Sequence, residues 1–508
     1  MAKVKDKEST PDIQNIMLNY MNDVLDECEK KEAISSTIDS GYYLSTGLLT
    51  FDMVMNGGIR SGWTTSLGLE QSGKTSLAIK ILGSLVKENI PGYFLDAEGS
   101  LNTEYTCAIA GIDNVEEYFG RKSPTGKGYE IVPKIRYTSE NGMEKIFRFM
   151  HRILLKLPDK LYREETKKWY YVFDKTKEDV ALMKSLDLHH DAKLYSATGR
   201  YWCEAPDGKF QVVFILDSLP GLEPEASGED ADGATNAMAF KARVMAKVAS
   251  PVRGLLRRKH AVLLPVNQQR QAPGVMFGPS EYEPMGNYIK FASDVRNELA
   301  SRNVPDWFEK GKTPAGSDTG QYGEEASVEG PGKDRYMYKL IKNIKNKNGI
   351  PYRQGWTRIW NADCNGKCRG FDPVFDTIKY LEYTKQVSLI KVNGRREISG
   401  LEKWFPELKG NVQYADFKRL ILGFETGRED LLQEFIKNTG LQIQVSDLPN
   451  IRKICFEQIQ SGEAFDLLLV KSVNNEINTG DEDFEDLESK EKVEFSEDFD
   501  EEDFEELN

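Results

Sequence analysis

Cysteine is scarce in this chain, and its distribution excludes two kinds of scaffold. The six cysteines among 508 residues are spread along the whole sequence, and none forms a C-x-x-C pair. We therefore expect reduced thiols rather than a disulfide framework. Cys364 and Cys368 lie four residues apart, but no second Cys or His pair lies nearby. Because a structural zinc site needs four nitrogen or sulfur ligands, we do not expect one here.

Long apolar runs are also missing. The longest are short stretches such as residues 261–266, far below the roughly 18 residues that a membrane-spanning helix needs. Residues 1–7 have no apolar segment behind them, so they are not typical of a signal peptide. We expect a soluble protein in the cytoplasm.

A surplus of positive charge is absent as well, since the formal net charge is −14. Of the 81 acidic and 67 basic residues, 16 and 2 lie in residues 481–508, which leaves 65 of each in the rest of the chain. The acidity belongs to the tail. It therefore does not argue against a basic, nucleic-acid-binding surface elsewhere.

The chain does contain a complete phosphate-binding loop of the form G-x-x-x-x-G-K-[ST]. Its residues are Gly68, Leu69, Glu70, Gln71, Ser72, Gly73, Lys74 and Thr75, followed by Ser76. The glycines let backbone N–H groups turn toward a phosphate, Lys74 adds positive charge, and the Thr75 hydroxyl can ligate Mg²⁺. An extended segment at residues 63–67 leads in and a helical pattern at residues 76–86 leads out, so the phosphate would meet a helix N-terminus. The alternative is a chance Gly/Ser turn before a helix.

From residue 41 onward, strand patterns alternate with helical ones. This alternation predicts an α/β fold with a mostly parallel sheet. The expected strands are residues 93–95, 212–216, 261–266, 295–300, 336–344 and 356–360. Ligands of such a sheet lie beyond the carboxyl ends of its strands, so the residues that follow each strand are candidates for a site.

Two carboxylates and an amide occupy such positions. Asp217 ends a buried apolar strand, where an unpaired charge is unfavourable, so hydrated Mg²⁺ is the expected partner. Glu98 would orient or deprotonate an attacking water. The alternative for either carboxylate is capping of the next helix. Gln268 lies in a run of neutral and cationic donors, residues 267–270, where a γ-phosphate could be sensed.

Taken in order, these motifs resemble those of the RecA-family recombinases. The segments that carry the resemblance are residues 45–59, 68–76, 96–105, 216–219, 266–291 and 345–352. The resemblance implies a RecA-like P-loop NTPase core that uses ATP and Mg²⁺. Its catalytic residues would be Lys74, Glu98 as the activator of water, and Gln268 as the sensor of the γ-phosphate. Tyr105 would stack on adenine with Asn102 beside it, although Asn102 stands where bacterial members commonly have an aspartate.

The same resemblance assigns a role to Lys345 and Lys347. They match the two lysines that reach ATP bound to the adjacent subunit, which would place the active site across a subunit interface. Without the resemblance, these lysines would be interpreted as a solvated strand end.

Two segments resemble DNA-binding loops. Residues 222–236 show no periodicity and are typical of a mobile loop. A second loop, residues 268–289, is rich in Gly and Pro and has an apolar tip that could separate stacked bases, formed by Val275, Met276, Phe277 and Gly278. Arg270 and Lys290 would take phosphates at its shoulders. The alternative is a lid that only covers the nucleotide.

These features together predict an ATP-dependent DNA recombinase. It would form helical filaments on single-stranded DNA and catalyse homologous pairing and strand exchange with double-stranded DNA. One alternative is a DNA helicase of the same superfamily, or a RadA-like translocase, although the RadA-type paired-cysteine module is missing. Another alternative is a single-strand-binding scaffold with a vestigial ATPase.

We expect four regions along the chain. Residues 1–40 would be a helical polymerisation segment, whose amphipathic helix packs on its own domain or on a neighbouring subunit. Residues 41–370 would form the ATPase core, with insertions at about 158–210 and 301–333. A smaller C-terminal domain would follow at residues 371–475, and a disordered acidic tail at residues 476–508.

The departures from the family leave several roles open. The insertion at residues 158–210 could serve DNA or a partner, or be a small surface subdomain. His189 and His190, within it, are a weak signal for a metal. The tail could compete with DNA, bind a single-strand-binding protein or a helicase, or simply solubilise the chain. The insertions and the tail suggest a relative of the phage UvsX proteins, in which case the location would be the host cytoplasm.

Overall fold

The computed structural model describes residues 42–112, 114–125, 127–164, 166–195, 199–225, 234–271, 281–285, 287–301, 335–362, 370–393 and 395–466, together with Met21. Several expected features lie outside these residues. They are the rest of the helix at residues 10–32, nearly all of the insertion at residues 301–333, the Cys364 and Cys368 stretch, and the acidic tail. The tip of the second loop, with Val275, Met276, Phe277 and Gly278, also lies outside them.

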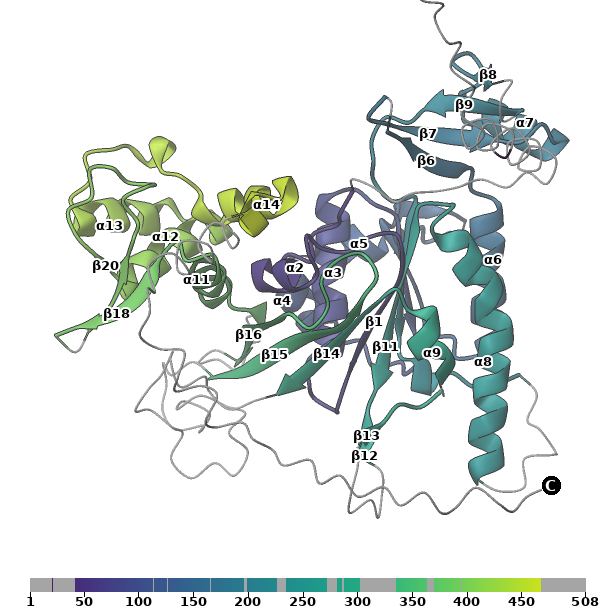
Figure 1. Ribbon diagram of the computed structural model, residues 1–508, viewed down its shortest axis with the longest axis horizontal. Helices are drawn as coiled ribbons and strands as arrows, with labels where there is room; N and C mark the ends of the chain where they lie inside the picture. The colour runs from purple at the N-terminus through teal and green to yellow at the C-terminus, as the bar shows by residue number, and fades with distance from the viewer. Residues whose placement is uncertain are drawn as a thin grey trace, which may run out of the picture.

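A nine-stranded sheet forms the centre of the described structure (Figure 1). Its strands, in spatial order, are β17 (Gly370–Phe371), β16 (Gln354–Ala362), β15 (Arg335–Asn346), β14 (Val295–Ser301), β1 (Gly62–Gly68), β11 (Ala261–Gln268), β10 (Val212–Asp217), β2 (Gly92–Asp96) and β5 (Ile135–Thr138). The six strands from β14 to β5 are parallel. The prediction of an α/β fold with a mostly parallel sheet is confirmed.

The edge formed by β15, β16 and β17 is antiparallel. Only a short stretch of chain joins β15 to β16, and a parallel connection would need a crossover of a dozen or more residues. The strands expected at residues 336–344 and 356–360 are therefore present but extend the sheet in alternating directions.

The central strands are buried on both faces, which explains why they are apolar runs rather than alternating patterns. In β10, Val213 and Ile215 belong to one apolar cluster. Phe214 and Leu216 belong to a second cluster on the other face. β10 thus contributes to two cores at once, and β2 and β11 do the same.

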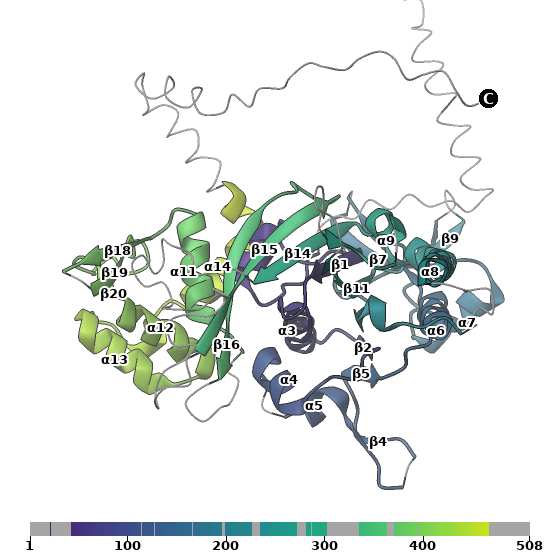
Figure 2. The same cartoon turned by 90° about the horizontal axis from the view of Figure 1, so that it is seen from below.

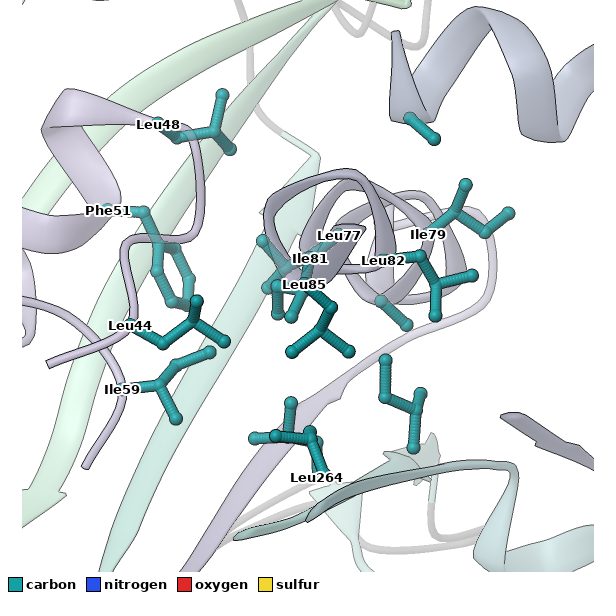
Figure 3. Close-up of a cluster of buried hydrophobic side chains, with 14 of the residues drawn as sticks. Leu44, Leu48, Phe51, Ile59, Leu77, Ile79, Ile81, Leu82, Leu85 and Leu264 are labelled. Atoms are coloured by element: carbon teal, nitrogen blue, oxygen red, sulfur yellow. The ribbon is translucent and has the colours of Figure 1, made fainter. Parts of the chain in front are cut away.

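Helices cover both faces of the sheet (Figures 1 and 2). The first cluster includes residues of α2 (Leu49–Val54), α3 (Lys74–Lys87) and α4 (Thr103–Ala110), and Figure 3 shows the apolar side of α3 facing the sheet. The second includes residues of α6 (Met143–Leu155), α8 (Ala234–Leu256) and α9 (Asn287–Ala292). A short helix and ribbon project below the sheet in Figure 2, made of α5 (Glu116–Phe119), β3 (Arg121–Lys122) and β4 (Tyr129–Ile131). Within the described part of the chain, no helix combines the length and apolar character needed to cross a bilayer.

The insertion that follows α6 folds as a small subdomain. Its four antiparallel strands lie in the order β6 (Asp159–Arg163), β7 (Lys168–Phe173), β9 (Arg200–Glu204) and β8 (Lys193–Tyr195), with α7 (Lys177–Ser185) alongside. Phe173, Met183 and Cys203 form its buried apolar cluster. It has its own core, which agrees with the alternative of a surface subdomain.

Ion pairs hold this subdomain to the core. Asp159, 1% exposed, pairs with Arg200 at 2.7 Å, Arg258 at 2.8 Å and Lys259 at 2.9 Å. Arg258 and Lys259 come just before β11 begins. The subdomain therefore lies at the amino ends of the parallel strands, away from the edge where ligands of such a sheet bind.

The C-terminal part packs against α2. Its elements are α11 (Pro373–Tyr383), β18 (Ser388–Val392), β19 (Arg395–Ser399), β20 (Val412–Gln413), α12 (Tyr414–Thr426), α13 (Glu429–Thr439) and α14 (Ile451–Ser461). Its apolar cluster includes Leu49 and Met53 of α2. One helix is thus shared between two cores.

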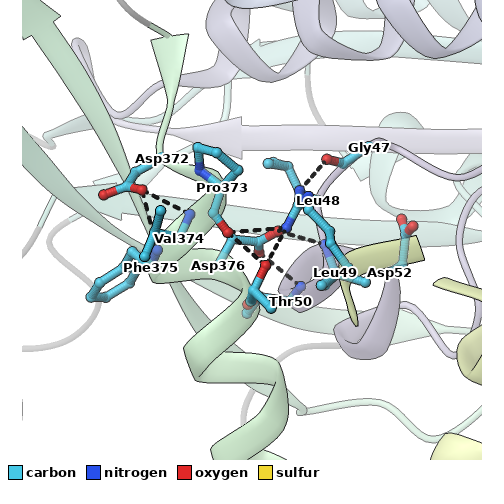
Figure 4. Close-up of polar contacts among 12 residues, drawn as sticks. Gly47, Leu48, Leu49, Thr50, Asp52, Asp372, Pro373, Val374, Phe375 and Asp376 are labelled. Carbon is cyan, nitrogen blue, oxygen red and sulfur yellow. Dashed lines mark hydrogen bonds and ion pairs between the residues drawn. The ribbon is translucent and has the colours of Figure 1, made fainter. Parts of the chain in front are cut away.

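A buried carboxylate joins these two parts (Figure 4). Asp376 of α11 accepts the backbone N–H groups of Leu49 at 2.9 Å and Thr50 at 3.0 Å, and so caps α2 from a distant part of the sequence. Arg452 of α14 pairs with Asp376 at 2.7 Å and donates to the Gly47 carbonyl at 3.0 Å. Both charged side chains are buried, so each depends on the other.

Asp376→Ala should lower the free energy of unfolding by about 3–5 kcal/mol, because it removes the cap of α2 and the closest carboxylate of the buried Arg452, leaving that charge with the more distant Glu425 at 3.5 Å. Urea unfolding followed by circular dichroism measures this. Arg428→Ala is the control, because Arg428 and Asp430 form an exposed pair with both side chains 59% accessible. An equal shift in the two variants would contradict the proposed importance of the buried pair.

Candidate nucleotide site

The phosphate loop lies between the end of β1 and the start of α3, as the sequence predicts. Gly73 is the N-cap of α3 and has a φ of 96°. Gln71 has a φ of 57°. At Gly68, an added Cβ would lie 2.2 Å from the Leu299 carbonyl oxygen and 2.7 Å from the Ser72 hydroxyl. The loop therefore needs glycine at Gly68 for close approach and at Gly73 for backbone conformation.

Lys74 lies over the loop. Its side chain is buried, and its Nζ donates to the Leu69 carbonyl at 2.6 Å and the Ser72 hydroxyl at 3.2 Å. Burial lowers the pKa of Lys74, while Asp217, Glu98 and Glu70 act in the opposite direction. An ammonium group held by neutral oxygens beside turned backbone N–H groups is suited to a phosphate.

Asp217 and Thr75, the two expected magnesium ligands, are in contact. Burial, together with the nearby carboxylates of Glu98 and Asp96, raises the pKa of Asp217 to about 6. The hydrogen bond from the Thr75 hydroxyl acts against this rise. A carboxylate and a hydroxyl are the hard oxygen donors that Mg²⁺ prefers, and a cation here would offset the crowding of negative charge. The donor set fits the predicted metal.

Glu98 lies beside Gln268. The Gln268 Nε2 donates to the Glu98 Oε1 at 3.2 Å, and the Ser218 hydroxyl donates to the same oxygen. Gln268 is opposite Gly68 in the ladder between β1 and β11, while Glu98 follows β2 and Ser218 follows β10, so the carboxyl ends of four strands meet at one place. The Asp217–Ser218 peptide bond is cis.

Neither carboxylate has the alternative role of a helix cap. The helix after Glu98 is α4, and Asn102 caps it by accepting the Tyr105 N–H at 2.9 Å. The 3₁₀ turn after Asp217, η1 (Leu219–Gly221), has no side-chain cap. Glu98 is exposed at the edge of the sheet, as a group that acts on water needs to be.

Asn102 and Tyr105 were both expected at the adenine. The Asn102 side-chain oxygen accepts the Tyr105 N–H in the cap of α4. The Tyr105 hydroxyl is hydrogen-bonded to the Ser76 hydroxyl in the first turn of α3. Tyr105 therefore lies next to the phosphate loop, whereas Asn102 has a structural role in this structure.

Sequence reasoning missed the part played by Asp96. This buried carboxylate, at the end of β2, accepts the N–H groups of Gly99 at 2.8 Å and Leu101 at 3.1 Å, and the Tyr137 hydroxyl at 3.0 Å. These bonds fix the backbone from which Glu98 projects. The position of Asp96 directly after an apolar strand was a signal that could have indicated this.

Lys345 and Lys347 lie near the amino ends of the parallel strands, whereas the phosphate loop lies at their carboxyl ends. The Lys345 Nζ donates to the Lys290 carbonyl at 2.6 Å, and Lys347 pairs with Asp294 at 3.2 Å. Asp294 also accepts the backbone N–H of Trp63, near the start of β1. The length of β1, about 20 Å at 3.3 Å per residue, separates this edge from Gly68. Within one subunit, these lysines cannot reach a nucleotide at the loop.

The structure separates two residues that were expected at the shoulders of one loop. Arg270 is exposed, two residues beyond Gln268, and pairs with Tyr282 where β12 (Arg270–Gln271) meets β13 (Glu281–Tyr282). Lys290, in α9, lies beside Lys345 at the other edge of the sheet. Arg270 is thus two residues from Gln268 at the nucleotide site, whereas Lys290 contacts Lys345 away from that site.

A second unexpected contact reaches the loop from β15. Lys339 is only 1% exposed, and its Nζ donates to the Gln71 carbonyl at 2.6 Å. β15 contains three lysines, Lys339, Lys342 and Lys345, and nothing in the local sequence distinguishes Lys339 as the one that makes this contact.

One other group in the described part of the chain could hold a metal. The ligand atoms of Asp187, His189 and His190 lie within 4.8 Å of one another. The group belongs to the insertion subdomain, at the amino ends of the parallel strands. It is therefore separate from the phosphate loop.

Gly68→Ala should lower the free energy of unfolding by about 2–5 kcal/mol, because its methyl group would overlap the Leu299 carbonyl as well as disfavour the backbone conformation. Gly427→Ala is the matched control, since Gly427 has a φ of 65° and nothing within 4 Å of an added Cβ. There the loss should be about 1–2 kcal/mol. Denaturant unfolding of both variants provides the comparison, and equal losses would contradict the close approach at Gly68.

The fold and the loop define a class of protein. A glycine-rich loop that joins a parallel strand to a helix, with a carboxylate at the end of a neighbouring strand, is the arrangement of a P-loop nucleotide-binding α/β protein.

Comparisons with known proteins make the family more specific. The family model of the RecA N-terminal domain matches residues 207–313. Protein RecA of Crocosphaera subtropica is 24% identical over 311 residues, 61% of this chain and 62% of that protein. Protein RecA of Arthrospira platensis is 24% identical over 341 residues, 66% of this chain and 67% of that protein. Protein RecA of Thermus aquaticus is 23% identical over 337 residues, 66% of this chain and 70% of that protein.

These findings show similarity to RecA proteins at low sequence identity, which confirms the resemblance predicted from the motifs. The chain spans less than two thirds of the length of the Crocosphaera relative. The matched segment, residues 207–313, contains Asp217, Gln268 and Arg270.

Proposed function

We propose that this protein is an ATP-dependent DNA recombinase that assembles on single-stranded DNA and promotes homologous pairing and strand exchange. The observation that carries the proposal is the hydrogen bond between Glu98 and Gln268. It connects the group suited to activate water with the strand end that leads directly into the candidate DNA loop. The similarity to RecA proteins supports the same conclusion.

Each residue of the site has a distinct task in the proposed reaction. The loop N–H groups and Lys74 bind the phosphates, and Thr75 and Asp217 hold Mg²⁺, which supplies neutralising charge to the phosphate oxygens when bound. Glu98 orients a water and accepts its proton, and Asp96 holds the backbone of Glu98 in place. Tyr105 provides a flat surface beside the loop for the base.

Gln268 would couple nucleotide to DNA. Its amide donates to Glu98, so a γ-phosphate that took over this hydrogen bond would act on the segment that follows Gln268. Arg270 is two residues further on, and beyond it lies the proposed DNA-binding tip, formed by Val275, Met276, Phe277 and Gly278. Arg270 would bind a DNA phosphate and the apolar tip would separate bases, so that hydrolysis relaxes the grip on DNA.

Lys345 and Lys347 would act on the nucleotide of a neighbouring copy. They lie at the edge opposite the loop, so a head-to-tail contact between copies can bring them to the next subunit's site. Such a heterologous contact produces a helical filament or a closed ring. Lys290, beside Lys345, would lie at the same contact.

The remaining regions follow from this assembly. We propose that residues 1–40 take part in polymerisation, residues 41–370 form the ATPase core, and residues 371–475 form a smaller domain fixed to it through Asp376. The tail at residues 476–508 would contact a partner such as a single-strand-binding protein or a helicase.

Electron microscopy separates the recombinase from its rivals. With single-stranded DNA and a slowly hydrolysed ATP analogue, we expect continuous helical filaments. Discrete rings together with strand unwinding would favour a helicase. DNA binding without any ATP hydrolysis would favour a scaffold.

Lys74→Ala and Glu98→Gln should separate binding from hydrolysis. Lys74→Ala should lose nucleotide affinity, because it removes the positive charge at the loop. Glu98→Gln should bind ATP but hydrolyse it about 10²–10⁴-fold more slowly, because an amide cannot accept the proton of water. ATPase assays with and without single-stranded DNA, together with calorimetric titration of nucleotide, measure both.

Lys87→Ala is the control for these variants, because Lys87 is exposed in the last turn of the same helix, α3. It should match the wild type in both assays. Full hydrolysis by Lys74→Ala would mean that the catalytic site lies elsewhere, and a rate that ignores DNA would contradict the proposed coupling.

A mixing experiment tests whether the site is shared between copies. Lys74→Ala protein and Lys345→Ala/Lys347→Ala protein should each be inactive alone. In an equal mixture, about a quarter of the contacts should have Lys74 intact on one side and Lys345 and Lys347 intact on the other. The mixture should therefore recover about a quarter of the wild-type activity. DNA-dependent ATPase activity of the mixture measures this, and no recovery would contradict action of these lysines across the interface.

A further inference from the structure

Lys339 makes an unusual set of contacts for a strand residue. It pairs with Ser301 of β14 and Thr357 of β16, in the interior of the sheet. Its Nζ donates to the Gln71 carbonyl, and its Cδ and Cε lie 3.7 and 3.5 Å from where a Cβ on Gly73 would be. The side chain therefore runs along the phosphate loop from Gly73, the N-cap of α3, to Gln71.

The contact fixes the direction of one peptide group. In a trans peptide, the carbonyl and the following N–H point in opposite directions. The Gln71 carbonyl points outward to Lys339, so the N–H of Ser72 points inward. That N–H is directed at the Leu69 carbonyl, 3.3 Å away, which is the same oxygen that accepts from Lys74. Lys339 thus aims a backbone donor at the interior of the loop, where Lys74 also lies.

The surroundings are unfavourable for a lysine unless an anion binds there. Burial, with the ammonium of Lys74 adding to it, lowers the pKa of Lys339 to about 8. Two lysines on either side of one glycine-rich loop repel each other, and a bound phosphate would relieve that repulsion. An apolar side chain at this position would fit the surrounding strand core more easily.

We propose that Lys339 is a positioning residue for the phosphate site. It holds the Gln71–Ser72 peptide with its N–H on the side of Lys74, where the phosphates of a bound nucleoside diphosphate or triphosphate would replace the Leu69 carbonyl as the acceptor of that N–H. This inference rests on the proposed function, because it takes the loop to be a nucleotide site. Unlike Lys345 and Lys347, Lys339 acts within its own subunit, and its effect does not depend on a γ-phosphate.

Lys339→Met tests the inference, because Met keeps most of the side-chain volume and removes the charge and the donor. Its affinity for Mg·ADP and for a slowly hydrolysed Mg·ATP analogue should fall by the same factor, about tenfold or more, since the bond to the carbonyl is charge-assisted. In steady-state ATP hydrolysis, KM should rise by a similar factor while kcat changes little. The thermal unfolding midpoint without nucleotide should stay the same or rise, because a buried charge has been removed.

Lys342→Met is the matched control, since Lys342 is on the same strand, three residues further on, and pairs with Glu298 and Gln354. It should bind both nucleotides like the wild type. Lys339→Gln, which keeps a shorter N–H donor, should lose less affinity than Lys339→Met and provides a second variant if the Met protein does not fold.

The outcomes separate this inference from the proposed function. If the wild type binds nucleotide and both Lys339 variants bind it equally well, the inference is wrong and the proposed function stands. A loss confined to the ATP analogue, or a lower unfolding midpoint with unchanged affinity, would also overturn it. If the wild type binds neither nucleotide, the proposed function itself fails.

Discussion

The parallel registers of β1, β11, β10 and β2 are the constraint on which the rest of the site depends. They place Gly68 opposite Gln268 and Asp217 opposite Asp96. Four positions that are far apart in the sequence therefore end at one edge of the sheet. Because each strand is buried on both faces, its register cannot slip without moving an apolar set from one core to the other. The geometry of the candidate site is thus a consequence of core packing.

The carboxyl ends of these strands bring together a carboxylate and a lysine, and burial disfavours the charged form of each. Asp217 is buried beside Glu98 and Asp96, which raises its pKa. Lys74 is buried on the other side of the loop, and its pKa is lowered by burial. A nucleotide with its metal brings a cation toward the carboxylates and anions toward the lysine. Binding would therefore offset the unfavourable burial of both charges. The folded protein should be more stable with the nucleotide and its metal than without them.

The parts of this structure that sequence could predict are those that depend on neighbouring residues. Strands buried on both faces are apolar runs, so β10 and β11 were found with nearly their observed bounds. The phosphate loop depends on the glycines, Lys74 and Thr75, which are adjacent in the chain. Asp217 and Glu98 follow from a simple rule about what comes after a parallel strand.

The parts that could not be predicted depend on contacts between distant segments. Asp376 caps α2 from more than 300 residues away in the sequence, and no local pattern distinguishes it from a surface carboxylate. The cap bond that Asn102 accepts from the Tyr105 N–H was not part of the sequence prediction, and the placement of Asn102 beside adenine stays a prediction. Lys339 is one of three lysines in β15, and no local pattern separates it from Lys342 and Lys345. Its partner, the Gln71 carbonyl, is a backbone atom, which leaves no signal in the sequence.

The rigid parts of the molecule limit where a nucleotide signal can travel. The insertion subdomain is fixed by Asp159 at the amino ends of the strands, and the C-terminal part is fixed to α2 through Asp376. β11 is held on both sides, by β1 and β10. A change in the hydrogen bond between Glu98 and Gln268 therefore cannot easily move β11 itself. Its effect has to emerge after Gln268, in the segment that begins with Arg270, and this is where the candidate DNA loop lies.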